Sequence, residues 1–152
     1  MKRKVFWQLT LLFGAAVFLV AQADHITAFT GSWKLDLAKS GFNPGPPFKS
    51  FNITFTPDGT RHLDLIAADG QRIEASLPWS DGKEVRVIGM NNATASSKIS
   101  GKTFHDVWRQ NERIIEDVHG EVSSDGRILK TSVDGTDRQG RTFHNRLTFE
   151  KR

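Results

Sequence analysis

Two acidic residues in the second half of the chain have a spacing that can place their carboxylates side by side. Asp106 alternates with Trp108, and Glu116 alternates with Val118, so strands that bury these apolar neighbours also turn both acids inward. If residues 110–112 connect the two strands, Asp106 lies directly opposite Glu116, where two carboxylates repel unless one is protonated or a cation lies between them. The pattern predicts a polar spot that orients a ligand. A shifted register or a wet cavity mouth is the plainer alternative, and general acid–base chemistry is a more remote one.

The histidines are the second candidate for chemistry, because imidazole serves both as a metal ligand and as a general base. The chain has five: His25, His62, His105, His119 and His144. None has the close helical spacing of a zinc motif, although strand geometry can bring distant histidines together. Alternation with Phe104 and Phe143 turns His105 and His144 toward solvent. We therefore expect no metal site.

Other signatures of catalysis and cofactor binding are missing from the sequence. There is no Gly-x-Ser-x-Gly segment, no Ser-His-Asp context and no phosphate-binding loop. The chain has no cysteine, which excludes disulfides, thiol catalysis and cysteine-ligated metals. We expect neither an enzyme nor a bound cofactor.

The elements that position these candidate residues are short segments of alternating apolar and polar residues, separated by turn residues. Sustained helical periodicity is missing, and the pattern favours an all-β fold. Because each segment is joined to the next by its own local turn, we expect a small antiparallel up-and-down barrel of about 8–10 strands. The expected strands are 31–38, 49–56, 61–67, 71–77, 84–87, 94–99, 103–109, 113–122, 127–134 and 141–150.

The turns between these segments also predict the register of the hairpins, because paired strands must present their apolar residues on the same face. Three-residue loops at 57–59 and 68–70 and a two-residue turn at 125–126 give one continuous apolar face. The expected pairs are Phe55 with Arg61, Ile53 with Leu63, Leu65 with Ile73, Leu63 with Ala75, Val122 with Leu129 and Val118 with Val133.

The first expected strand carries a Gly-x-Trp sequence, Gly31-Ser32-Trp33. By alternation Trp33, Leu35 and Leu37 share one face, so the indole points inward. A large ring beside a glycine that permits close backbone approach suits a plug at one end of a barrel, with an ordinary core Trp of a sandwich as the alternative.

Residues 1–23 have the pattern of a secretory signal peptide. Lys2, Arg3 and Lys4 precede an apolar run at 9–20, and Ala21-Gln22-Ala23 forms an Ala-x-Ala cleavage site. A retained membrane anchor is the alternative, but the run is short for a membrane span. We expect residues 24–152 to form one exported domain, periplasmic or extracellular, with no integral membrane span after processing.

Charge excludes one class of partner. The net charge is +4, and the three cationic residues of the leader supply most of it, which leaves +1 for residues 24–152. Nucleic acids and anionic membranes require a basic face, which so small a charge does not provide. We expect a monomer that does not bind nucleic acid.

The opening Gly31-Ser32-Trp33-Lys34-Leu35 followed by Ser40, together with the closing segment 147–151, resembles the calycin families, the lipocalins and fatty-acid-binding proteins. With Ala38-Lys39-Ser40, Pro44-Gly45-Pro46 and repeated Asp-Gly turns, the chain is most similar to secreted bacterial lipocalin-like proteins. The resemblance implies a β-barrel that carries a small ligand.

The sequence also departs from these relatives. Residues 41–48 are too short and proline-rich for the helical pair of fatty-acid-binding proteins. The Arg-x-Tyr pair that commonly holds a fatty-acid carboxylate is replaced by Leu147 and Phe149. Lipocalins tend to set a C-terminal Arg across the Gly-x-Trp indole; Arg146 or Arg152 is the candidate, but alternation turns Arg146 outward.

Our leading hypothesis is an exported barrel that binds or carries a small, mostly hydrophobic molecule in its interior. The alternative is a filled barrel that acts as a protein-interaction or inhibitor module through loops 42–48 and 80–92. The residues expected to line the interior are Trp33, Phe51, Phe55, Leu65, Phe104, Asp106, Trp108, Glu116, Val118, Leu147 and Phe149.

Overall fold

The computed structural model describes residues 26–152, which form ten β-strands and one short 3-10 helix. The expected signal peptide, residues 1–23, lies outside the described residues, and a single domain over 24–152 stays a prediction. The elements are β1 (Gly31–Leu35), η1 (Leu37–Lys39), β2 (Ser50–Phe55), β3 (Arg61–Ile66), β4 (Arg72–Leu77), β5 (Glu84–Arg86), β6 (Ala93–Ser100), β7 (Thr103–Gln110), β8 (Arg113–Val122), β9 (Ile128–Thr136) and β10 (Thr142–Lys151).

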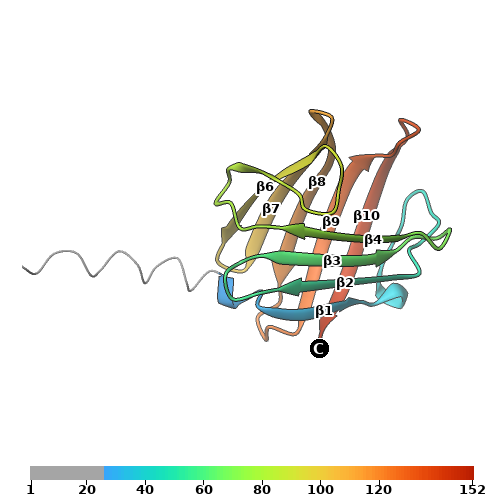
Figure 1. Cartoon of the computed structure of the whole chain (residues 1–152). Coiled ribbons are helices and arrows are strands. Elements are labelled where there is room, and N and C mark those ends of the chain that lie inside the picture. Colours follow the sequence, from blue (N-terminus) through green and yellow to red (C-terminus); the bar gives the residue numbers. More distant parts are fainter. Residues whose placement is uncertain (1–25) are drawn as a thin grey trace, which may run out of the picture.

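The strands form one antiparallel sheet that curls into a nearly closed barrel. In the order β4-β3-β2-β1-β10-β9-β8-β7-β6-β5, all consecutive strands are neighbours except β4 and β5, which form the two edges, and the first and last strands, β1 and β10, pair with each other. The strands β1–β4 cross β6–β10 at a steep angle (Figure 1). The two edges meet at one bridge, where the backbones of Ser76 and Ile88 exchange two hydrogen bonds of 2.9 Å. The expected all-β meander barrel is confirmed.

The expected hairpin registers are confirmed as well: each of the six pairs named above occurs in the sheet. Asp58, Asp69 and Asp125 each accept a hydrogen bond from the backbone N–H two residues later, which tightens these turns. Gly59 has a φ of +85° and packs against Trp79, so the turn requires both the left-handed conformation and the missing side chain.

The connection between β7 and β8 was predicted wrongly. It is a two-residue turn in which Asn111 and Glu112 both have positive φ, and Gln110 pairs with Arg113. An irregularity between Trp108 and Arg109 then leaves one extra residue in β8. Asp106 consequently lies opposite Val118, not opposite Glu116. Because the shift amounts to two residues, both acids keep their inward orientation.

The first strand is also shorter than expected. It ends at Leu35, because the Asp36 carboxylate accepts hydrogen bonds from the N–H groups of Ala38 and Lys39 and so caps η1. Leu37 therefore leaves the inward face that Trp33 and Leu35 share, and it is 43% exposed.

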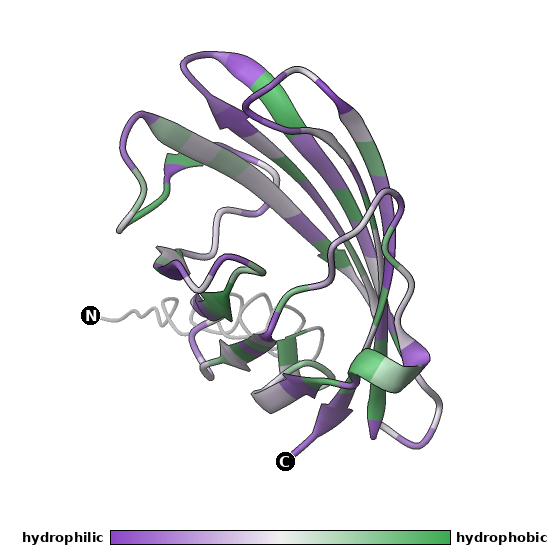
Figure 2. Cartoon of the chain, turned by 90° about the vertical axis from the view of Figure 1, so that its right-hand side faces the viewer, coloured by the Kyte–Doolittle hydropathy of each residue, from purple (hydrophilic) through white to green (hydrophobic). Residues whose placement is uncertain are grey.

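Apolar and polar residues alternate along the strands (Figure 2), which gives the barrel its apolar interior. Trp33 is 0% exposed, and its indole N–H donates a hydrogen bond of 2.7 Å to the carbonyl of Phe29. Phe29 belongs to a helical turn in which its own N–H and that of Thr30 bond to Ile26. No helix among residues 26–152 is long and apolar enough to cross a membrane.

We predict that Trp33→Ala lowers the free energy of unfolding by about 3–5 kcal/mol, because it empties a buried site and leaves the Phe29 carbonyl without its donor. Trp79 is only half-buried, so Trp79→Ala should cost clearly less. Urea unfolding of both variants measures the difference. Equal, small losses would show that the indole does not hold this end of the barrel together.

Candidate ligand-binding site inside the barrel

The structure places all of the predicted lining residues on inward faces of the strands. Most are buried: Trp33, Phe55, Phe104, Asp106, Trp108, Val118, Leu147 and Phe149. The other three, Phe51, Leu65 and Glu116, are half-buried. Whether these residues bind a ligand stays a prediction.

One end of the barrel is filled by aromatic rings. Phe29 lies 5.4 Å from Phe55 and 5.6 Å from Phe104, measured between ring centroids, and Phe55 and Phe104 are 6.3 Å apart. Phe104 has room because Gly120 faces it: a Cβ at Gly120 would lie 2.1 Å from the ring. We call this end, built around Phe29, Phe55 and Phe104, the closed end.

A cation covers the Trp33 indole, but it is neither of the two arginines considered from the sequence. The Lys151 Nζ lies 5.2 Å from the ring centroid. Lys151 pairs with Trp33 across β10 and β1, which fixes this contact. Arg146 faces solvent, as its alternation predicted, and forms an ion pair with Asp134.

A buried ion pair crosses the interior beside the closed end. The Arg61 guanidinium from β3 binds both carboxylate oxygens of Asp106 on β7, and its Nη2 also donates to the Ser97 hydroxyl at 3.2 Å. The guanidinium carbon lies 4.7 Å from the Phe55 centroid and 4.4 Å from that of Phe104. The bidentate contact with the carboxylate and the neighbouring aromatic rings compensate most of the cost of burying this arginine, although its Nε has no hydrogen-bond partner among the described residues.

Glu116 on β8 also faces the interior, where it lies opposite Trp108. Burial raises the pKa of Glu116 to about 7, and repulsion from the Asp106 carboxylate adds to this effect. The two inward-facing carboxylates predicted from the sequence are therefore both present, but they are not directly opposite each other. Arg61 neutralises Asp106, and the raised pKa of Glu116 favours its protonated form up to near-neutral pH.

Away from the closed end, the inward-facing apolar residues are less completely buried. Leu63 and Leu65 on β3, Ile73 on β4 and Val133 on β9 point inward by alternation and are only half-buried. Leu65 and Ile73 lie directly opposite each other. Together with Glu116, these four apolar residues form what we call the open end.

The proline-rich loop beside the barrel packs inward. Phe42 contacts Phe48 at 5.2 Å, Phe48 contacts Phe51 at 6.0 Å, and Phe51 contacts the buried Phe149 at 5.3 Å, all edge to face. Its backbone is also bound to β10, since the N–H of His144 donates to the carbonyl of Asn43 at 2.6 Å. The loop therefore extends the aromatic wall of the barrel.

The sequence analysis missed two residues of this interior. Phe29 precedes the first strand, so alternation gave no indication of its position. Arg61 was correctly placed opposite Phe55 but was not recognised as an inward-facing charge, although its alternation with Leu63 and Leu65 indicated this.

Metal-ligating side chains also come together on the outside of the barrel. In the described part of the chain, one group of three such residues converges: His105, Asp117 and His119. The expectation of no metal site rested on the missing helical spacing and on the solvent-facing orientation of His105 and His144, and it did not anticipate that His105 and His119 pair across two strands.

Comparison with known proteins identifies the architecture. Neither a protein-family model nor a curated protein matches the chain. Among solved structures, the fluorescent protein UnaG matches over 84% of this chain and 99% of its own, with a TM-score of 0.55 at 10% identity. A point mutant of UnaG matches over 84% and 98%, with a TM-score of 0.57 at 12% identity.

The chain has the calycin fold. The sequence resemblance therefore predicted the calycin architecture correctly. At this level of identity the match says nothing about the ligand, which must be argued from the interior of the barrel itself.

We predict that the Arg61→Met variant loses about 3–5 kcal/mol of stability, because it leaves the Asp106 carboxylate buried without its partner. The double variant Arg61→Met, Asp106→Leu should recover much of this loss, since neither charge remains. Urea unfolding measures both. As a control, Arg141→Ala breaks the exposed Arg141–Asp137 pair and should move the urea midpoint little. A single variant as stable as the wild type would show that the ion pair is not buried as described.

We predict a distinct pH dependence from Glu116. Its pKa is about 7 in the folded chain against an ordinary value of 4.5, so between these values the folded state binds more protons than the unfolded state. The resulting stabilisation is complete below about pH 4.5 and is lost as the pH rises toward 7. At 1.36 kcal/mol for each pH unit, this loss is at most about 3 kcal/mol, and less where solvent reaches the carboxyl.

The Glu116→Gln variant should lack this loss. Urea unfolding of wild type and variant from pH 4.5 to pH 8 should give curves that diverge as the pH rises, with the variant relatively more stable above pH 7. Glu121→Gln, at an exposed position of the same strand, is the control and should follow the wild type. Parallel curves for wild type and Glu116→Gln would contradict the assignment.

Proposed function

We propose that this protein binds a small, mostly apolar molecule in the interior of the barrel, which the molecule enters through the open end. The observation that carries the proposal is the contrast between the two ends. Aromatic rings fill the closed end, whereas inward-facing apolar side chains at the open end keep partial contact with solvent. An apolar ligand there would remove this surface from water, with a gain of about 25 cal/mol per Å².

The size of the barrel supports this proposal. An interior of about eight strands is just wide enough for side chains to fill it or to hold one small ligand, and the diameter grows with the number of strands. This barrel has ten strands, and β4 and β5 approach each other through only one bridge among the described residues.

The polar groups of the interior limit the chemistry of the ligand. Arg61 and Asp106 neutralise each other, so the pair has no net charge to offer a charged ligand. Glu116 belongs to the open end and, where its pKa of about 7 keeps it protonated, can donate a hydrogen bond. A mostly apolar molecule with one neutral acceptor, such as a carbonyl or hydroxyl oxygen, fits this environment better than a fatty-acid carboxylate.

The alternative of an interaction module finds less support. In loop 42–48 the large side chains Phe42 and Phe48 pack toward Phe51 and not toward a partner, so in loop 80–92 the exposed Ile88 remains as the apolar side chain for this alternative. We further propose that the protein acts outside the cytoplasm, after removal of residues 1–23. A monomer, no nucleic-acid partner and no catalysis stay predictions.

We predict that the neutral apolar dye Nile red binds the purified protein with increased fluorescence, and that Leu65→Trp weakens this binding at least about tenfold, or ~1.4 kcal/mol, by filling the open end. The matched control is Ile66→Trp, which adds the same ring to the next residue of β3, on the outer face. Fluorescence titration measures both. The absence of dye binding to the wild type, or an equal loss in both variants, would argue for a filled barrel.

A further inference from the structure

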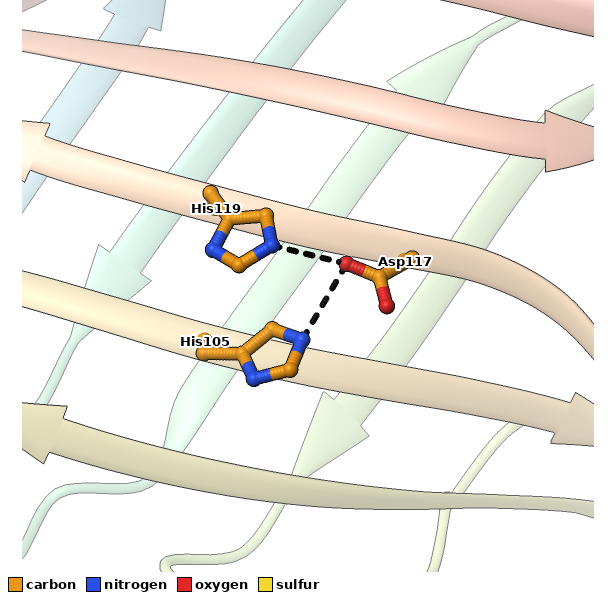
Figure 3. Close-up of side chains that lie close together, drawn as sticks. All are labelled: His105, Asp117 and His119. Atoms are coloured by element: carbon orange, nitrogen blue, oxygen red, sulfur yellow. Dashed lines mark hydrogen bonds and ion pairs between the residues drawn. The ribbon is translucent and has the colours of Figure 1, made fainter.

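A convergence of side chains on the outer face of the barrel stands apart from the interior. His105 on β7 and His119 on β8 are directly opposite each other in the sheet, and Asp117 precedes His119 by two residues on the same face. Figure 3 shows both imidazole rings directed at the Asp117 carboxylate. The side chains of His105, His119 and Asp117 are 45%, 59% and 44% exposed, respectively, so solutes reach them freely.

The geometry of the group is that of three ligands around one point. The two rings are stacked at 4.2 Å with an angle of 3° between their planes, and the Nε2 atoms of both rings lie beside the Asp117 carboxylate. These atoms lie 3.1 and 3.0 Å from the same Asp117 oxygen, and the three ligand atoms are all within 4.8 Å of one another. Two ligand atoms bound to one metal ion at about 2.0–2.2 Å are separated by ~2.8–3.1 Å in octahedral geometry and by ~3.3–3.6 Å in tetrahedral geometry.

We propose that His105, Asp117 and His119 form a binding site for a divalent transition-metal ion of the zinc class. Two imidazole nitrogens and one carboxylate oxygen suit Zn²⁺, Ni²⁺, Co²⁺ or Cu²⁺, whereas Mg²⁺ and Ca²⁺ require mostly oxygen ligands. Three protein ligands on an exposed face leave the remaining coordination positions to water.

The backbone around the site is already ordered. The strands β7 and β8 pair continuously around the three residues and are flanked by β6 and β9, so metal binding need not order a loop. Only side-chain rotations of two imidazoles and one short carboxylate have to be fixed, which keeps the entropic cost of binding low.

The charges around the site are mixed. Lys98 lies opposite His105 on β6 and opposes a cation, whereas Asp134 lies opposite Asp117 on β9 and favours one. His105 and His119 also line an open groove of about 770 Å³ on this face, together with Lys98 and Arg146. The site is therefore accessible, and its affinity depends on the three ligands themselves.

The test is calorimetric titration of Zn²⁺ into the metal-free chain without an affinity tag. Because His25 lies outside the described residues, the reference protein and every variant carry His25→Ala, so that this histidine cannot contribute a ligand. We expect one Zn²⁺ to bind and Mg²⁺ to give no signal. His105→Ala and His119→Ala should each weaken Zn²⁺ binding at least about tenfold, since each removes one of three protein ligands. Asp117→Asn should also weaken it, because it removes the negative charge.

The matched control is His144→Ala, which removes another exposed histidine paired with an aspartate on the outer face. This variant should bind Zn²⁺ as the wild type does. In nitrogen-15 NMR spectra, Zn²⁺ should shift the side-chain signals of His105 and His119 but not those of His62. No binding of Zn²⁺ at millimolar concentration, or equal losses in His144→Ala and His105→Ala, would overturn the proposal.

Discussion

The ion pair between Arg61 and Asp106 is the constraint on which the interior depends. A guanidinium and a carboxylate removed from water are tolerated only with good geometry and further hydrogen bonds, which the bidentate contact and Ser97 supply. The pair joins β3 to β7 across the barrel and so connects the two crossing sets of strands. Phe55 and Phe104 must both stay in contact with the Arg61 guanidinium, which also fixes the closed end.

The same constraint shapes the chemistry of the open end. Since Arg61 neutralises Asp106, the interior as a whole would be nearly uncharged if Glu116 were protonated. Burial and the proximity of Asp106 raise the pKa of Glu116 and favour this neutral form. Under the proposed function, such an interior favours apolar ligands over charged ones, because a charged ligand would pay a desolvation cost there. The metal site proposed at His105 and His119 lies on the outer face and does not depend on this interior.

Much of the fold could be predicted because its information is local. Each hairpin is fixed by its own turn, so Asp58-Gly59 and Asp125-Gly126 were enough to predict the register of their strands. What failed depends on longer-range or irregular features. An extra residue in β8 cannot be predicted from alternation, which is why Asp106 was placed opposite the wrong residue. The convergence of His105 and His119 likewise becomes visible only once the strands are paired.

The central claim is that an apolar molecule enters the interior through the open end. Methyl NMR of the carbon-13-labelled protein during titration with Nile red tests this claim residue by residue. The account predicts that the methyl signals of Leu63, Leu65 and Val133 shift at the open end, while those of Val107 and Ile114, outside the inward-facing set, stay in place. Shifts confined to Val107 and Ile114, or no shift among the interior methyl groups, would contradict it.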